Sequence, residues 1–181
     1  MKKYISVYGF NCLLFATILL FAGCATSRKA ERIAKATQEA KEKAIKEKYA
    51  DKIGIPADSI NLPLYSFVDE WYGTPYKYAG HTKSGVDCSD FVCILLQTIY
   101  NKTLSGTAGD IFDQCAPVSP DSLKEGDLVF FKIKSKAISH LGFYLQNNKF
   151  VHATVHAGVM IDDLGEDYYK KYFYKAGRLK V

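Results

Sequence analysis

Residues 139–154 read SHLGFYLQNNKFVHAT, and the architecture of the domain can be inferred outward from this stretch. Two runs of aliphatic, aromatic and β-branched residues, 138–145 and 150–154, flank the turn signal Asn147-Asn148. The pattern predicts two neighbouring β-strands. The first strand carries His140 and the second carries His152.

The same kind of pattern extends on both sides of this stretch. Short strands are predicted at 128–132, 158–162 and 175–181. Apolar residues at helical spacing between Leu64 and Trp71 predict a short helix. Further helices are predicted at 88–100, at 108–115, where the pattern is weaker, and at 166–174. Helices followed by a run of strands predict an α+β domain with a mostly antiparallel sheet.

Cys88 stands between Asp87 and Ser89, in the first turn of the predicted helix 88–100. The positive end of the helix dipole and the unpaired N–H groups there favour a thiolate, which is the nucleophilic form of cysteine. Taken alone this signal is weak, because a cysteine on a helix is usually a structural residue.

The histidines strengthen the case for a nucleophilic cysteine. Such a cysteine needs a base within hydrogen-bond reach and a third polar group that holds the base in one tautomer. His140 can be the base and His152 the orienting residue. A strict two-residue turn at Asn147-Asn148 would place them on opposite sheet faces, so we predict an odd-length connection or a bulge.

The net charge of +5 is unevenly distributed along the 181 residues. Residues 1–23 carry +2, residues 24–52 carry +4 and residues 53–181 carry −1. The part of the chain predicted to fold is therefore near neutral, which argues against nucleic-acid binding.

The N-terminus has the layout of a secretory signal. Lys2 and Lys3 precede the apolar run 13–21, and the stretch LFAGC at 20–24 resembles a bacterial lipobox, with Phe21 where Leu is usual. We predict a signal peptide over 1–23 and a lipid on Cys24 that anchors the protein outside the cytoplasm. Ala25, in place of an Asp, favours the outer membrane, with the domain facing the periplasm. An uncleaved membrane anchor is the alternative.

Residues 27–50 are rich in Ala, Lys and Glu and contain neither Gly nor Pro. Favourable Glu/Lys pairs four residues apart and the lack of a wide apolar stripe predict a solvated helical tether. The alternative is a basic strip that lies on anionic lipid. The domains predicted are the signal peptide 1–23, the lipid anchor and tether 24–60, and a catalytic domain 61–181.

Five motifs together resemble the NlpC/P60 family of cell-wall peptidases, and within it the lipid-anchored murein endopeptidases of the Spr type. They are GTPYKYAG at 73–80, SGVDCSDFV at 84–92, EGDLVFF at 125–131, the stretch 139–154 and GVMID at 158–162. The resemblance implies a papain-like fold in which N-terminal helices, including the one with the cysteine, pack on the sheet that carries both histidines.

The resemblance also implies roles for individual residues. Cys88 matches the nucleophile, His140 the general base and His152 the third polar residue. The positions that match substrate-binding residues are Tyr76, Asp87 and Ser89. No metal or organic cofactor is implied.

Two positions depart from the family pattern, Ala79 and Asp90, where Gly is usual. The Asp90 carboxylate suits the helix N-terminus, but it would raise the pKa of the Cys88 thiol if the two groups came close.

Several other residues have simpler interpretations. We expect His81 to be a solvated loop residue and His156 to lie in a turn, since a zinc site with His152 lacks a third ligand. Cys93 is expected to be a core thiol, with a disulfide to Cys115 as an alternative. The aromatic residues at helical spacing in 168–174 are expected to form core and groove wall.

Together these observations predict a monomeric cysteine endopeptidase of the cell envelope. It would hydrolyse an amide bond in peptidoglycan stem peptides or their cross-links by a Cys-His-His triad. A catalytically silent lipoprotein that binds wall peptides, and an acyl or amide transferase that uses the same thiol, are the alternatives.

Overall fold

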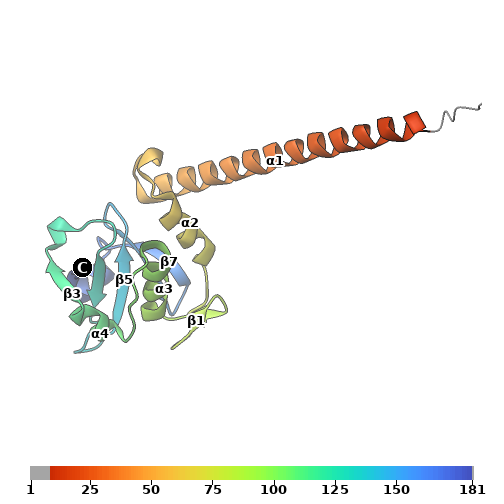
Figure 1. Cartoon of the computed structure of the whole chain (residues 1–181). Coiled ribbons are helices and arrows are strands. Elements are labelled where there is room, and N and C mark those ends of the chain that lie inside the picture. Colours follow the sequence, from red (N-terminus) through yellow and green to blue (C-terminus); the bar gives the residue numbers. More distant parts are fainter. Residues whose placement is uncertain (1–8, 181) are drawn as a thin grey trace, which may run out of the picture. The chain divides into compact units, whose positions relative to one another are not determined.

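A computed structural model of the chain describes the backbone of residues 9–180 and the side chains of residues 27–180 (Figure 1). It divides into two compact units, residues 1–44 and residues 45–181. The predicted signal peptide 1–23 and the predicted lipidation site Cys24 lie outside the residues whose side chains are described.

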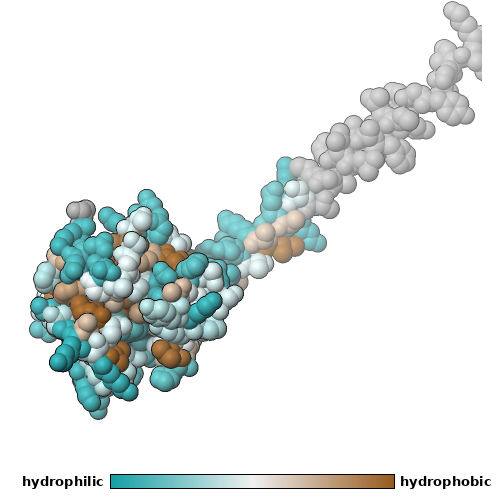
Figure 2. Space-filling model, turned by 90° about the horizontal axis from the view of Figure 1, so that it is seen from below, coloured by the Kyte–Doolittle hydropathy of each residue, from teal (hydrophilic) through white to brown (hydrophobic). Residues whose placement is uncertain are grey.

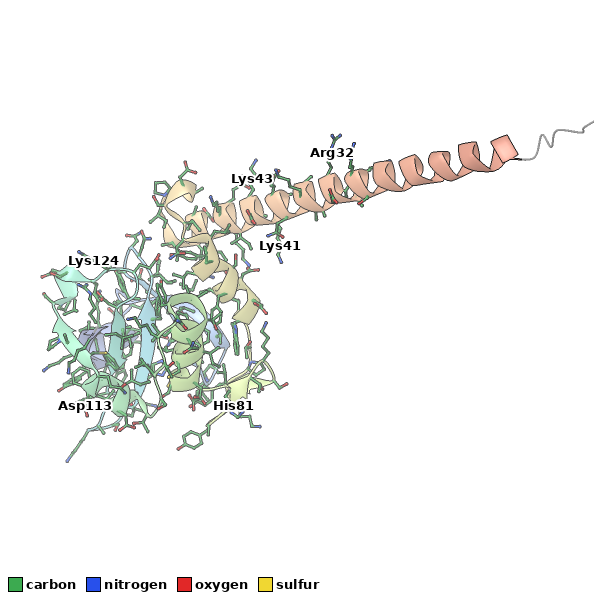
Figure 3. The ribbon with its side chains drawn as sticks, in the orientation of Figure 1. Arg32, Lys41, Lys43, His81, Asp113 and Lys124 are labelled. Atoms are coloured by element: carbon green, nitrogen blue, oxygen red, sulfur yellow. The ribbon has the colours of Figure 1, made fainter. Side chains whose placement is uncertain are left out.

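Helix α1 spans Gly9–Ile53 and includes the helix predicted at 27–50. Side chains before Ile45 are exposed or half-buried, and an ion pair joins Lys35 to Glu39 at 3.8 Å. Arg32, Lys41 and Lys43 project outward from the helix (Figure 3). The described surface is largely hydrophilic there, apart from a small apolar patch (Figure 2). Ile33 is an exposed apolar residue of this helix. In the described part of the chain, no helix is both apolar and long enough to span a membrane.

The last turns of α1 belong to the folded unit. Ile45, Tyr49 and Ile53 recur every four residues and are 7%, 0% and 1% exposed. Asp69 accepts hydrogen bonds from Tyr49 and from Lys48. The compact unit therefore begins at Ile45, earlier than the boundary at 61 predicted from composition, because one apolar face of this charged helix is buried.

Two helices follow. A 3₁₀ turn at Ala57–Ser59 precedes α2, Leu62–Trp71, which Asn61 caps through the N–H of Leu64. A short antiparallel hairpin, β1 (His81–Thr82) and β2 (Gly85–Val86), leads into α3, Cys88–Tyr100. Helix α3 occupies the range predicted for it, and its apolar face packs on the sheet (Figure 1).

A capping box of Thr107 and Asp110 starts α4, Ala108–Asp113, which is shorter than the predicted helix 108–115. The chain then enters strand β3, Cys115–Val118, which sequence reasoning did not predict, and a 3₁₀ turn at Pro120–Ser122.

The main sheet has six strands in the order β3-β8-β4-β5-β6-β7, with antiparallel neighbours throughout. Its bounds are β4 Leu128–Phe131, β5 His140–Tyr144, β6 Lys149–Thr154, β7 Gly158–Asp163 and β8 Phe173–Leu179, with α5 (Asp167–Tyr172) before β8. The α+β class and the antiparallel sheet are confirmed.

Apolar residues cover both faces of this sheet. Odd-numbered residues of β5 and β6, such as Leu141 and Val151, pack with helices α2 and α3. On the other face a smaller cluster includes Phe131, Phe150 and Tyr169, the last of these from α5. Both histidines lie at even-numbered positions and share this second face.

Candidate active site

Cys88 is the first residue of α3 and is 7% exposed. Asp87 caps the helix by accepting the N–H of Asp90 at 2.9 Å. Burial raises the pKa of the Cys88 thiol, and the Asp87 carboxylate adds to the increase. Hydrogen bonds from the backbone N–H of Leu141 and from Ser89 oppose both effects. The resting cysteine is therefore a neutral thiol, placed beside the strand residue that follows His140.

The second oxygen of Asp87 accepts the N–H of Ala79 at 3.0 Å. Ala79 has a φ of 53°, a conformation for which Gly is better suited. Asp87 thus joins the loop before the hairpin to the start of α3. Asp90 is not among the groups that raise the pKa of Cys88; its own pKa is raised by burial and by the Asp87 carboxylate, which the opposing effect of His81 only partly offsets. The carboxylate that acts on the thiol is that of Asp87.

His140 and His152 lie against each other on the second face of the sheet. Nε2 of His140 is 2.6 Å from Nδ1 of His152. Phe143 pairs with Val151 and Tyr144 with Phe150, so the numbers of paired residues have even sums. The N–H of Leu145 bonds to the carbonyl of Lys149, which leaves 146–148 as the connection. This odd-length connection is the one predicted.

The packing beneath the histidines depends on Gly142. A Cβ at this position would lie 2.5 Å from Cδ2 of Phe150, whose ring centroid is 4.5 Å from that of His152. The aromatic ring of Phe150 therefore fills the space that a side chain at 142 would need. The Phe150 ring therefore packs directly against the ring of His152 and supports it.

Two residues that sequence reasoning did not select complete this cluster. Nε2 of His152 is 2.9 Å from Oδ2 of Asp162, and the hydroxyl of Tyr169 donates to the same oxygen. The β6–β7 register, in which Phe150 pairs with Asp162, places Asp162 on the face of His152. In the β6–β7 hairpin the numbers of paired residues have an even sum, so even-numbered residues of both strands share one face. This parity is the sequence signal that could have found Asp162.

Burial dominates the electrostatics of the cluster. It lowers the pKa of His140 to about 3, with a further contribution from His152, and it also lowers the pKa of His152. Burial alone would raise the pKa of Asp162, but hydrogen bonds from His152 and Tyr169 outweigh it and hold the pKa below its usual value. The resting cluster is therefore two neutral imidazoles and one carboxylate.

A cavity of about 540 Å³ opens beside the histidines. Tyr76, His140, His152 and Tyr169 are among the residues that line it, and Cys88 is not. Burial raises the pKa of Tyr76, and the negative charges of Cys88 and Asp87 add smaller increases. The rest of the lining comprises Ile133, Lys134, Ser139, Ala153, Thr154, Val155, His156, Glu166 and Tyr168.

The remaining residues that were interpreted from the sequence lie apart from the histidine pair. His81 is exposed on β1 (Figure 3), and His156 is exposed in the β6–β7 turn, at the rim of the cavity. Cys93 and Cys115 are free thiols. Within the described residues, no three His, Cys, Asp or Glu side chains are grouped so as to hold a metal ion.

Comparisons with known proteins agree with this architecture. The NlpC/P60 family model matches residues 73–178. Probable endopeptidase NlpC of Escherichia coli K12 is 34% identical over 93% of this chain and 98% of its own length. Murein DD-endopeptidase MepS/Murein LD-carboxypeptidase of the same strain is 36% identical over 61% of this chain and 58% of its own length. The crystal structure of an NlpC/P60 family protein from Bacillus cereus superposes with a TM-score of 0.59, at 25% identity, over 65% of this chain and 39% of that one.

Proposed function

Because the chain belongs to the NlpC/P60 family, we propose that it is a cysteine endopeptidase that hydrolyses an amide bond in peptidoglycan stem peptides or their cross-links. One observation carries the proposal. His140 and His152 are in hydrogen-bond contact. Leu141, the next residue of the same strand, donates its backbone N–H to the Cys88 thiol.

Hydrolysis begins from the neutral thiol. Cys88 transfers its proton to His140 as the sulfur attacks the substrate carbonyl carbon, which gives a tetrahedral intermediate. His140 then gives this proton to the leaving amine, and the carbon–nitrogen bond breaks to leave a thioester. In the second half, His140 removes a proton from water as the water oxygen attacks the thioester carbonyl carbon. The carbon–sulfur bond then breaks to release the acid, and His140 returns the proton to the sulfur of Cys88. The backbone N–H of Cys88 at the start of α3 is a suitable oxyanion donor, with Tyr76 as a second.

Three further residues are assigned to substrate binding in this proposal. Tyr76 lines the cavity, and Asp87 and Ser89 flank the nucleophile. Each Asp87 oxygen accepts one backbone N–H, and a carboxylate has further lone pairs that can accept hydrogen bonds from an amine. A free amino group at the end of a stem peptide is the group that these residues would bind.

Digestion of purified sacculi tests the proposal. We expect the wild-type chain to release new muropeptides, Cys88→Ala to release none, and the matched variant Cys93→Ala to behave as wild type. The products, resolved by mass spectrometry, identify the bond that is cleaved. Identical profiles for wild type and Cys88→Ala would rule out this enzyme activity, and formation of an amide with an added labelled amine would instead indicate a transferase.

We also propose that the protein is monomeric and is held on the envelope by a lipid on Cys24, at the outer membrane with its domain in the periplasm. The lipobox-like stretch 20–24 and the charged helix that follows support this location. Labelled palmitate should enter the wild type and not Cys24→Ser, and the variant should leave the membrane fraction. Equal labelling of the two would contradict the proposal, and light scattering on the purified chain measures the oligomeric state.

A further inference from the structure

Asp162 is the last of three side chains joined in a row by hydrogen bonds, His140, His152 and Asp162. Its Oδ2 is 2.9 Å from Nε2 of His152, whose Nδ1 is 2.6 Å from Nε2 of His140. The side chain of His152 is 1% exposed and that of Asp162 is 12% exposed, so water cannot substitute freely for either contact. The three side chains form one continuous series of hydrogen bonds on the second face of the sheet.

The chemistry of these groups fixes the position of every proton in the series. A carboxylate only accepts hydrogen bonds, so Nε2 of His152 must carry a proton. In a neutral imidazole the other nitrogen is then an acceptor, which makes Nδ1 of His152 the acceptor for His140. His140 must therefore carry its proton on Nε2, and its Nδ1 is left with the free lone pair.

We propose that Asp162 is a positioning residue of the active site, which fixes the tautomers of His152 and His140 and stabilises the positive charge that His140 acquires when Cys88 loses its proton. Its effect on catalysis rests on the proposed function. Its effect on the tautomers does not, because it follows from the hydrogen bonds alone.

Tyr169 has a supporting part in this arrangement. Its hydroxyl donates to Oδ2 of Asp162 and lies 3.4 Å from Nε2 of His152. With the carboxylate removed, that hydroxyl would be free to donate to Nε2 of His152. His152 would then carry its proton on Nδ1 and donate to His140, so the lone pair of His140 would move from Nδ1 to Nε2.

The adjacent carboxylate provides a matched control. Asp163 is paired with Lys149 at 2.7 Å and accepts the N–H of Gly165. No contact joins Asp163 to either histidine, although both carboxylates lie at the end of β7. A substitution of Asp163 therefore removes a negative charge from the end of β7 but leaves the hydrogen bonds among His140, His152 and Asp162 intact.

Nitrogen NMR of the full chain labelled with ¹⁵N-histidine tests the tautomers directly. We expect both ring protons on Nε2 in the wild type, with assignments from His140→Gln and His152→Gln. In Asp162→Leu we expect protons on Nδ1 of both rings, and in Asp163→Asn no change. Wild-type tautomers in Asp162→Leu would overturn the inference.

Kinetics on peptidoglycan test the catalytic consequence. Asp162→Leu should lower kcat by about ten-fold or more with little change in KM. Asp163→Asn should match the wild type, and Asp162→Leu should cause no further loss in a His152→Ala background, since it acts through His152. If Asp162→Leu does not fold, Asp162→Asn replaces it, because it can keep the hydrogen bond but not the charge.

An unchanged kcat in the folded Asp162 variant would overturn the inference. An inactive wild type would contradict the proposed function instead, and the NMR measurement would still decide the inference.

Discussion

Nε2 of His140 lies 2.6 Å from Nδ1 of His152, and the two residues can meet only because an odd number of residues connects their strands. Asn147 and Asn148 adopt φ values of 51° and 61°, which asparagine tolerates better than most residues. The turn chemistry of two exposed residues thus determines which face of the sheet carries the site.

Gly142→Ala should both destabilise the protein and lower its activity. The added Cβ meets the Phe150 ring, which must move together with the His152 ring that packs on it. Overpacking of this kind costs about 1–3 kcal/mol. Urea denaturation measures the loss. The control is Gly109→Ala at a half-buried helix position where the nearest atom lies 3.7 Å from the added Cβ, and this change should be neutral or stabilising.

Asp87→Ala should lower the free energy of unfolding by about 0.5–2 kcal/mol through loss of the helix cap alone. The carboxylate also holds the N–H of Ala79, so the loss should lie at the upper end of that range. Asp87→Asn keeps a good capping side chain and should lose less. Equal thermal stability of Asp87→Ala and the wild type would show that this residue is not structural.

Stability should fall as the solution becomes acidic. The pKa of His140 is about 3 in the folded state against 6.5 in the unfolded chain, so the unfolded state binds the extra proton between these values. The stability that neutral His140 provides is therefore present above about pH 6.5 and is lost as the pH falls toward 3. The urea midpoint against pH measures this, and the slope should be shallower in His140→Gln.

Tyr49→Ala should cost about 3–5 kcal/mol, the range found for large buried aromatic residues. Tyr49 is fully buried and its ring centroid lies 5.2 Å from that of Tyr65, although it stands in a segment with the composition of a solvated tether. Lys41→Ala, in the same helix but before Ile45, is the control and should leave stability unchanged. Equal unfolding midpoints for the two variants would place the start of the folded unit after residue 49.

The sequence was sufficient to predict the elements that carry strong periodicity. Helix α3 and the four strands from β4 to β7 fall where the patterns of apolar residues indicate, and the contact of His140 with His152 follows from the requirement for an odd connection. Strand β3 was missed because it is a short edge strand interrupted by Pro117.

Asp162 and the end of α1 were missed for a different reason. The burial of 45–53 depends on how distant segments are placed, which local patterns do not encode, whereas the position of Asp162 depends on the register of the β6–β7 hairpin. The register between β6 and β7 decides that Asp162 faces His152 and not the opposite side. The three buried residues of 45–53, Ile45, Tyr49 and Ile53, are too few to stand out among the charges of α1, and only their packing against the rest of the domain makes them part of the core.

The boundary at Ile45 separates the part of α1 that sets helix length from the part that contributes to folding stability. Among the α1 residues whose side chains the structure describes, those at 27–44 are not part of the buried core, whereas Ile45, Tyr49 and Ile53 are. Each helical residue added or removed between 27 and 44 changes the length of this part of α1 by about 1.5 Å. We expect such insertions and deletions, even of a whole turn, to leave the folding free energy of the unit from Ile45 onward unchanged.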